Sequence, residues 1–244
     1  MLYLLTATGA RPQAFAICQR LMLAQDYAGP VIWVIVDDGP EPQPITFKRR
    51  GWATVLIRPL PRWRPGQNTQ ARNMAAGLQL IGDHARVAII EDDDYLAPGY
   101  LSAVREWLDS ADLVGENVTR YFHVPHQVPH ENTPVKYACL FATAVKGPAL
   151  AALKLLCQQP PQFIDIELWR SFRGAKALHM THHCVGIKGL PGRPGITAGH
   201  KLTGVANPGK LREWIGADAD LYIGDGSGQF RADDQQSGLR PVPR

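Results

Sequence analysis

The chain lacks a hydrophobic run long enough to cross a membrane. Lys146 and Pro148 interrupt the best candidate, whereas a transmembrane helix needs about 20 apolar residues. The first residues, Met1 to Leu5, carry no basic leader and are too short for the apolar region of a signal peptide. The sequence therefore predicts a soluble protein that works in the cytoplasm without a membrane partner.

Closely paired cysteines are also missing. The four cysteines lie far apart and none belongs to a CxxC pair, which argues against a zinc module and predicts reduced thiols that serve packing. His179, His182, His183 and Cys184 lie closer together, but their spacing fits no zinc motif. Strand alternation would divide them between two faces. We interpret this group as packing residues.

A strong charge of either sign is absent as well. The formal net charge is +4, with 45% hydrophobic and 20% charged residues, which describes an ordinary globular protein. Such a charge allows an anionic ligand or nucleic acid but requires neither. The 244 residues suffice for one large α/β domain or two small ones, and no internal repeat is visible.

Short apolar runs alternate with helical patterns in the first half of the chain. This alternation predicts a mostly parallel sheet, whereas the second half is mixed. Strands are expected over residues 2–6, 31–36, 53–57, 87–90, 112–124 and 135–144. Helices are expected from Pro12, over 69–81, 98–108, 147–157 and 165–172, and from about Pro208.

Four consecutive carboxylates, Glu91 to Asp94, follow the buried-strand pattern of Val87 to Ile90. Neighbouring carboxylates repel one another and raise one another's pKa. A hard cation such as Mg²⁺ or Mn²⁺ relieves this repulsion, and open α/β sheets place ligands at this end of their strands. An acidic turn in solvent is the alternative. The position after a buried strand favours a metal site.

A second acidic pair, Asp37-Asp38, ends the second predicted strand. Both acidic ends would lie at the same edge of a parallel sheet and could face one ligand. An aspartate in this place commonly accepts hydrogen bonds from a ribose or a base. The alternative is turn initiation, because Asp-Gly is ordinary turn chemistry.

The segment from Gly186 to Gly195 has glycine at every third position. It is too short for a collagen helix. We interpret it as a loop whose backbone approaches a phosphate closely, assisted by Lys188, Arg193 and Lys201. His200 follows as a candidate ligand for the same metal.

The chain resembles the family 2 glycosyltransferases of the GT-A fold in four segments and one proline. They are Thr6-Ala7-Thr8, Val34-Ile35-Val36-Asp37-Asp38-Gly39, Ala71-Arg72-Asn73, Ile89-Ile90-Glu91-Asp92-Asp93-Asp94, and Pro98. The resemblance implies a single GT-A-like α/β domain with a mostly parallel central sheet flanked by helices and a mixed C-terminal half. On the family's D-x-D-D-x-x-x-P pattern, Glu91 takes the first acidic position and Asp93 is the metal ligand, with Asp92 and Asp94 as alternatives.

The resemblance also implies which residues contact the donor and the metal. The nucleotide and diphosphate contacts would come from Thr6, Thr8, Asp37, Asp38, Arg72, Asn73, Asp92, Lys188 and Arg193. The metal ligands would come from Asp93, Asp94, Glu91 and, as in GT-A enzymes generally, a C-terminal histidine, here His200.

A further segment, Ile164 to Arg170, is similar to the family's E-D-x-D-L-W motif. The second acid of that motif is the general base, which implies this role for Asp165. Ile164 stands where the family has glutamate. The alternative reading is an amphipathic helix with two solvated acids.

Together these resemblances imply an inverting transferase that uses Mn²⁺ or Mg²⁺ and a nucleoside diphosphate sugar, with a UDP-sugar as first choice. Residues 1–110 would form the nucleotide-binding half of a domain over 1–224, residues 111–224 the acceptor half with the C-terminal loop, and 225–244 a flexible tail. A nucleotidyltransferase and an inactive sugar-nucleotide-binding domain are the alternatives.

The acceptor would be a hydroxyl group. The glycine-rich segment up to His200 and the compact length resemble sugar transferases of bacteriophages, some of which decorate hydroxymethylated DNA bases, so DNA is one candidate. The stretch from Lys48 to Arg64 combines basic and aromatic residues that could contact phosphates and stack on a base. A solvated loop is the alternative interpretation of that stretch.

Overall fold

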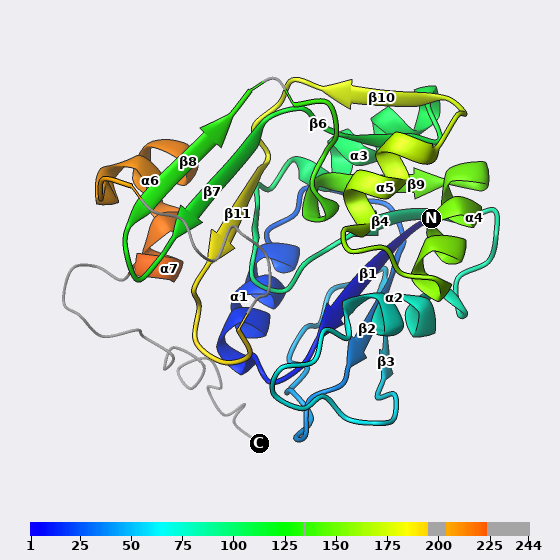
Figure 1. The fold of residues 1–244 in the computed structure, drawn as a ribbon, viewed down its shortest axis with the longest axis horizontal. Helices are drawn as coiled ribbons and strands as arrows, with labels where there is room; N and C mark the ends of the chain where they lie inside the picture. Colours follow the sequence, from blue (N-terminus) through cyan, green and yellow to red (C-terminus); the bar gives the residue numbers. More distant parts are fainter. Residues whose placement is uncertain (134, 195–203, 224–244) are drawn as a thin grey trace, which may run out of the picture.

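The computed structural model describes residues 1–133, 135–194 and 204–223 (Figure 1). The first half contains β1 (Leu2–Thr8), α1 (Pro12–Leu23), β2 (Val31–Asp37), β3 (Trp52–Ile57), α2 (Gln70–Leu78), β4 (Arg86–Ile89), β5 (Tyr95–Leu96) and α3 (Tyr100–Ser110). The second half contains β6 (Leu113–Glu116), β7 (Thr119–His123), β8 (Val128–Asn132), η1 (Leu140–Ala142), β9 (Thr143–Lys146), α4 (Gly147–Gln158), α5 (Ile164–Ser171), β10 (Lys176–His179), β11 (Cys184–Lys188), α6 (Pro208–Ile215), η3 (Gly216–Ala219) and α7 (Asp220–Ile223).

The main sheet has seven strands in the order β10-β6-β9-β4-β1-β2-β3. Among the described strands of this sheet, β9 alone runs antiparallel to its neighbours, β4 and β6. The connections through α1 and α2 run in opposite directions along the sheet, so right-handed crossovers place these helices on opposite faces, as Figure 1 shows. The expected fold class, a mostly parallel α/β sheet flanked by helices, is confirmed.

Burial on both sides of the central strands explains their apolar composition. Leu4, Trp33 and Ile35 in β1 and β2 have no exposed surface, as expected for strands of a parallel sheet covered by helices on both faces. The apolar face predicted for the first helix, including Phe15 and Cys18, is buried against this sheet. Because β2, β1 and β4 are parallel, Asp37 at the end of β2 and the acidic residues after β4 lie at the same edge of the sheet.

Two strands predicted in the second half are wrong in extent. The predicted strand 112–124 is two strands that belong to different sheets, β6 and β7, separated at Asn117 and Val118. The predicted strand 135–144 is largely an irregular segment followed by η1, and β9 begins only at Thr143. The apolar run from Ala138 to Ala142 is buried in the core. Burial of this kind does not require a strand.

A second sheet, in the order β5-β11-β7-β8, lies beside the main one. Its strand β11 contains Gly186 to Lys188, which pair with β7, so the phosphate loop predicted from Gly186 begins only after Lys188. The glycine at 186 serves packing, because a Cβ there would lie 2.4 Å from Cδ1 of Tyr121. Periodic glycine alone did not distinguish this strand from a loop.

The C-terminal part is described up to Ile223. The helix expected from Pro208 is α6. His200, Lys201 and the predicted tail 225–244 lie outside the described residues. In the described ranges, no helix is both long enough and apolar enough for a membrane crossing.

Gly115 lies at a contact that joins β6 to the segment before β9. A Cβ at this position would lie 2.4 Å from Cβ of Ala138 and 2.6 Å from the carbonyl oxygen of Ala142. The backbone cannot move to relieve this clash as easily as a flexible side chain could. We therefore expect Gly115→Ala to lower the free energy of unfolding by about 1–3 kcal/mol. Urea denaturation measures this change. Gly82→Ala is the matched control, since a Cβ there meets nothing within 4 Å; equal stability of both variants would contradict the expectation.

Candidate active site

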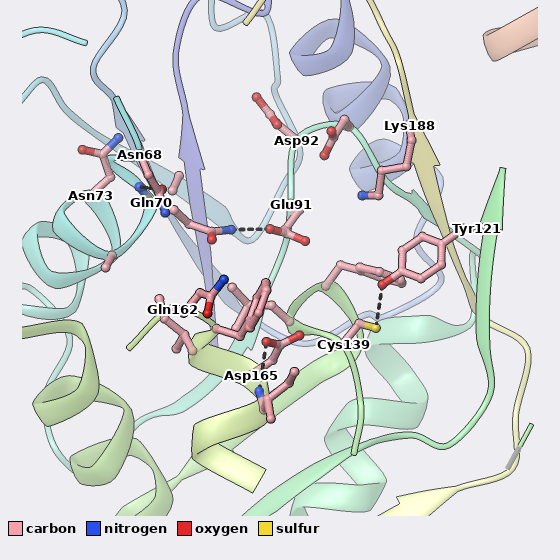
Figure 2. A pocket seen from close by; sticks show the side chains of 18 of the residues that line it. Asn68, Gln70, Asn73, Glu91, Asp92, Tyr121, Cys139, Gln162, Asp165 and Lys188 are labelled. Carbon is pink, nitrogen blue, oxygen red and sulfur yellow. Dashed lines mark hydrogen bonds between the residues drawn. The ribbon is translucent and has the colours of Figure 1, made fainter. Parts of the chain in front are cut away.

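A cavity of about 740 Å³ lies where β1 and β4 end, between the two halves of the chain. Figure 2 shows Glu91 and Asp92 on one side of it and Gln162 and Asp165 on the other. The polar residues that line it from the first half are Thr8, Arg11, Asn68, Gln70, Asn73, Glu91, Asp92 and Asp93. Those from the second half include Thr119, Tyr121, His130, Asn132, Tyr137, Gln162, Asp165, Lys188 and Arg193.

The acidic run after β4 is paired with basic side chains of the chain itself. Arg11 Nη1 donates to Asp92 Oδ1 at 3.0 Å and to Asp93 Oδ2 at 2.8 Å. Lys188 Nζ lies 3.1 Å from Asp94 Oδ1, which also accepts from the Ile187 backbone N–H. The repulsion expected within the acidic run is therefore partly offset by two cations.

Burial is the largest cause of the raised pKa values of Glu91, Asp92 and Asp94. It raises the pKa of Asp94 to about 6, with Lys188 opposing the rise. Burial also raises the pKa of Asp92, where Arg11 opposes it, and that of Glu91, to which Asp94 adds further repulsion. Glu91 accepts a hydrogen bond from Gln70, and both side chains line the cavity (Figure 2). The ionised form of these carboxylates is therefore unfavourable unless a cation lies beside it.

Arg11 is a residue of the site that the sequence did not predict. It lies between the end of β1 and the start of α1, directly before Pro12. Burial alone would lower its pKa, but Asp93 and Asp92 raise it overall, so the guanidinium stays charged. Its place after the first strand, at the same sheet edge as the acids, was the available signal.

The acids at the end of β2 are fully buried and do not line the cavity. Asp37 accepts from the backbone N–H groups of Gly39 and Gln43, which matches the turn-forming alternative. Asp38 accepts from Arg72 at 2.8 Å and from Arg193 at 3.0 Å. The two aspartates therefore hold the loops around the cavity together.

Two other residues expected at the donor site, Thr6 and Arg72, and one expected metal ligand, Asp94, also do not line the cavity. Thr6 accepts a hydrogen bond from the indole N–H of Trp33 at 2.9 Å, so its hydroxyl packs inside the sheet. Arg72 and Asp94 are engaged by their ion-pair partners and do not line the cavity. Thr8, Asn73, Asp92, Lys188 and Arg193 do line it.

The loop after β11 is fastened to the turn after β1. The Arg193 backbone N–H donates to the Ala10 carbonyl at 3.0 Å, and Arg11 Nε donates to the Arg193 carbonyl at 2.8 Å. Gly192 has φ +104°, and a Cβ on it would lie 2.5 Å from the Ala10 carbonyl oxygen, so glycine permits this approach. The Arg193 guanidinium lies over the Trp63 ring at 5.0 Å.

Asp165 lies in the first turn of α5 and lines the cavity opposite Glu91 (Figure 2). Its Oδ1 accepts from the Ile166 backbone N–H at 2.9 Å. Burial raises its pKa, and backbone hydrogen bonds oppose the rise. Glu167, the other acid of this turn, pairs with Arg170 on the outer surface. Asp165 is therefore the acid of α5 that could exchange a proton with a bound molecule.

The basic and aromatic stretch after residue 48 is used partly inside the protein. Arg49 donates to the carbonyls of Met22 and Tyr27 and lies over Trp52. Arg58 donates to the Gly39 carbonyl. These contacts reduce the number of cations that remain available for an external phosphate.

The group of histidines around Cys184 packs as expected. The His179 ring stacks on Trp107 with centroids 4.5 Å apart, and Cys184 is buried. Within the described residues, no group of three or more His, Cys, Asp or Glu side chains could hold a metal ion.

In the described residues, the predicted metal ligands are paired with groups of the chain itself. Asp92 and Asp93 bind Arg11, Asp94 binds Lys188, and Glu91 accepts from Gln70. Oxygen ligands suit a hard cation, but here they already face basic or amide groups of the chain. His200 lies outside the described residues, so the predicted metal set stays a prediction.

Comparison with known proteins gives a likeness of structure. No protein-family model and no curated protein matches the sequence. The crystal structure of S. aureus TarS 1–349 in complex with UDP-GlcNAc matches with a TM-score of 0.50 at 12% identity, covering 87% of this chain and 64% of that one. The complex of TarS 1–349 with UDP gives a TM-score of 0.47 at 10% identity, covering 77% and 60%.

The chain thus spans about three fifths of the length of the TarS 1–349 chains. At this identity the likeness shows the fold alone. The fold is the α/β fold expected from the sequence, with the mostly parallel central sheet described above, and TarS 1–349 resembles it.

Proposed function

We propose that the protein is a glycosyltransferase that moves a sugar from a nucleoside diphosphate sugar to a hydroxyl acceptor with inversion. The observation that carries the proposal is one cavity lined by the cations Arg11, Lys188 and Arg193 and by the half-buried acid Asp165, whose pKa is raised. The fold shared with TarS, crystallised with UDP-GlcNAc, supports a UDP-sugar as the first donor to test.

In this reaction the acceptor oxygen attacks the anomeric carbon from the face opposite the diphosphate. The new carbon–oxygen bond forms as the bond to the β-phosphate oxygen breaks, and the electron pair leaves on the nucleoside diphosphate. Asp165 takes the acceptor proton. Arg11, Lys188 and Arg193 offset the charge that develops on the leaving group.

The raised pKa of Asp165 suits this role. A free aspartate, with a pKa of about 3.9, is ionised at neutral pH but is a weak base. Burial strengthens it as a base while leaving it able to ionise. Asp165 lines the same cavity as Lys188 and lies apart from it (Figure 2), which leaves room for a sugar between them.

The acceptor is a hydroxyl-bearing molecule. A hydroxymethylated DNA base, as modified by certain bacteriophage enzymes, is one candidate suggested by the sequence, through the glycine-rich segment, the compact length and the basic and aromatic stretch from Lys48 to Arg64. Binding of duplex DNA at low salt that weakens as salt rises would support it. Absence of binding at low salt would remove it.

Donor binding is tested by thermal unfolding with a panel of nucleotide sugars. A ligand at about 100 times its Kd stabilises the folded state by about 2.7 kcal/mol, so we expect one nucleotide sugar, UDP-GlcNAc first, to raise the melting temperature. Arg193→Ala should reduce the shift. Arg170→Ala, on the outer surface of α5, is the control and should retain it. A panel without any shift would contradict the proposal.

The same experiment decides the metal prediction. Stabilisation that persists in EDTA would assign the charge compensation to the basic side chains of the cavity, Arg11 and Lys188 among them. Stabilisation that requires Mn²⁺ would support the metal site predicted from the acidic run, since a cation bound by both protein and diphosphate couples their affinities.

A further inference from the structure

Charged side chains are distributed unevenly around the cavity. Among its described lining residues, segments 7–93 and 188–194 contribute Arg11, Glu91, Asp92, Asp93, Lys188 and Arg193. The lining residues of segment 119–166 include a single Asp, Glu, Lys or Arg side chain, that of Asp165. We call the lining residues of segment 119–166 the neutral wall. The charged side chains of the lining thus come almost entirely from segments 7–93 and 188–194.

Two aromatic rings of the neutral wall are unusually open to solvent. Tyr137 is 37% exposed and Phe163 is 39% exposed, and both line the cavity. Phe163 lies two residues before Asp165, at the N-cap of α5. Burial raises the pKa of Tyr137, and Cys139 and Asp165 add to the rise. Flat apolar surface therefore lies beside the proton acceptor.

Uncharged hydrogen-bonding groups complete the neutral wall. His130 and Asn132 lie on β8 and are exposed, and Gln162 lies close to Asp165 in Figure 2. An amide side chain offers both donors and an acceptor, so these residues can bind hydroxyl groups without contributing charge. Aromatic surface next to amides is suited to a molecule with an apolar face and a polar edge.

We propose that the neutral wall binds the acceptor as an uncharged saccharide ring, and that Tyr137 and Phe163 determine this specificity. A pyranose ring has an apolar face of C–H groups, which matches the aromatic rings, and an edge of hydroxyls, which matches Asn132 and Gln162. The inference rests on the proposed transferase function. In the transfer, one ring hydroxyl gives its proton to Asp165 as its oxygen forms the glycosidic bond and the donor's bond to diphosphate breaks.

An anionic acceptor finds few free cations at the neutral wall. Lys188 lies over Tyr121 and Phe141 of this wall but is paired with Asp94. A phosphate beside Tyr137 and Phe163 would share the wall with the Asp165 carboxylate, which is unfavourable at low dielectric. The nearest basic residue along the chain, Lys136, is exposed and does not line the cavity. Arg120 of β7 is paired with Glu131 at 2.7 Å. Binding of a DNA backbone would need a basic surface beside the base pocket, and these residues do not form one.

The test measures UDP released from UDP-GlcNAc, above the rate of donor hydrolysis by water, with three sets of acceptors. They are neutral methyl glycosides and disaccharides, the phosphorylated counterparts of the same sugars, and a single-stranded oligonucleotide that contains 5-hydroxymethylcytosine. We expect at least one neutral saccharide to increase UDP release and its phosphorylated counterpart to be at least about tenfold weaker, the effect of one unfavourable charge contact. No increase with any neutral saccharide, or an equal or larger increase with a phosphorylated sugar or the oligonucleotide, overturns the proposal.

Variants then assign the specificity to the two rings. Phe163→Ala and Tyr137→Ala should each raise the acceptor KM by about tenfold, the loss of one stacking contact, whereas Phe163→Tyr should restore it. Met180→Ala, at an exposed apolar residue outside the cavity, is the control. An unchanged acceptor KM in both alanine variants overturns the assignment. Failure of the proposed function is distinct, since UDP-GlcNAc would then neither stabilise the protein nor release UDP.

Discussion

Asp165→Asn is expected to reduce sugar transfer by at least about 10²-fold, the lower range for loss of a general base. Asparagine keeps the size of the side chain but cannot accept a proton from the acceptor hydroxyl. Because Asp165 lies apart from Lys188 in the cavity (Figure 2), donor affinity should stay nearly unchanged. Rates of UDP release with acceptor, together with calorimetric donor titration, measure both effects.

The matched control for this variant is Glu167→Gln on the same helix turn. Glu167 pairs with Arg170 and does not line the cavity, so its replacement should leave transfer intact. Full turnover by Asp165→Asn would remove Asp165 from the mechanism. Equal loss in both variants would indicate damage to α5 instead of loss of a base.

The same assignment predicts the pH dependence of transfer. Asp165 must be ionised to accept a proton, and burial raises its pKa above the ordinary 3.8. The value of kcat/KM should therefore fall as the pH falls through that raised pKa, with the midpoint above 3.8. A profile measured from about pH 4 to pH 8 shows this acid limb. A flat profile over this range would be inconsistent with Asp165 as the base.

Lys188→Met is expected to destabilise the folded protein by about 3–5 kcal/mol, the usual effect of removing one partner of a buried ion pair. Lys188 and Asp94 are almost fully buried, and Asp94 Oδ2 already lacks a hydrogen-bond partner among the described residues. Methionine keeps the length of the side chain and leaves the Asp94 carboxylate without its cation. Urea denaturation at neutral pH measures the loss.

Two controls separate the ion pair from general damage. The double variant Lys188→Met/Asp94→Asn should recover part of the stability, because no unpaired carboxylate remains. Lys154→Met removes an ion pair with the exposed Asp83 and should have a much smaller effect, as surface pairs contribute little. If Lys188→Met and Lys154→Met changed stability equally, the buried pair would not have the importance given to it here.

The destabilisation by Lys188→Met should also depend on pH. The pKa of Asp94 is raised to about 6 in the folded protein, so below this pH Asp94 becomes neutral and needs no cation. A raised folded pKa favours the folded state at low pH, and this contribution is lost as the pH rises through about 6. The penalty of the variant should accordingly be smaller at about pH 5 than at pH 7.

The sequence predicted the parts of the site that follow from strand order. Asp92 and Asp93 come directly after a buried parallel strand, and the edge of such a sheet brings them to the cavity together with Thr8. Asp165 was found through a motif similarity and lines the same cavity. Sequence position and sheet geometry were sufficient for these residues.

Other residues depended on contacts that the sequence does not specify. Asp38 follows a buried strand as Asp92 does, yet Arg193, distant along the chain, covers it. Arg11 belongs to a short turn without a recognised motif, and Tyr137 belongs to an irregular segment predicted as a strand. Tertiary packing of loops decided which polar groups face the cavity, and local patterns do not encode that choice.

The most direct test of the central claim is identification of the product released from UDP-GlcNAc by the purified protein. A glycosyltransferase breaks the bond between the sugar and the diphosphate, so we predict that UDP accumulates, slowly with water and faster with an acceptor, and that Asp165→Asn suppresses the acceptor-dependent part. A nucleotidyltransferase releases pyrophosphate from a nucleoside triphosphate, and an inactive binding domain releases nothing, so neither would form UDP from UDP-GlcNAc. Absence of UDP, or release of pyrophosphate when UTP and N-acetylglucosamine 1-phosphate are supplied instead, would contradict the account.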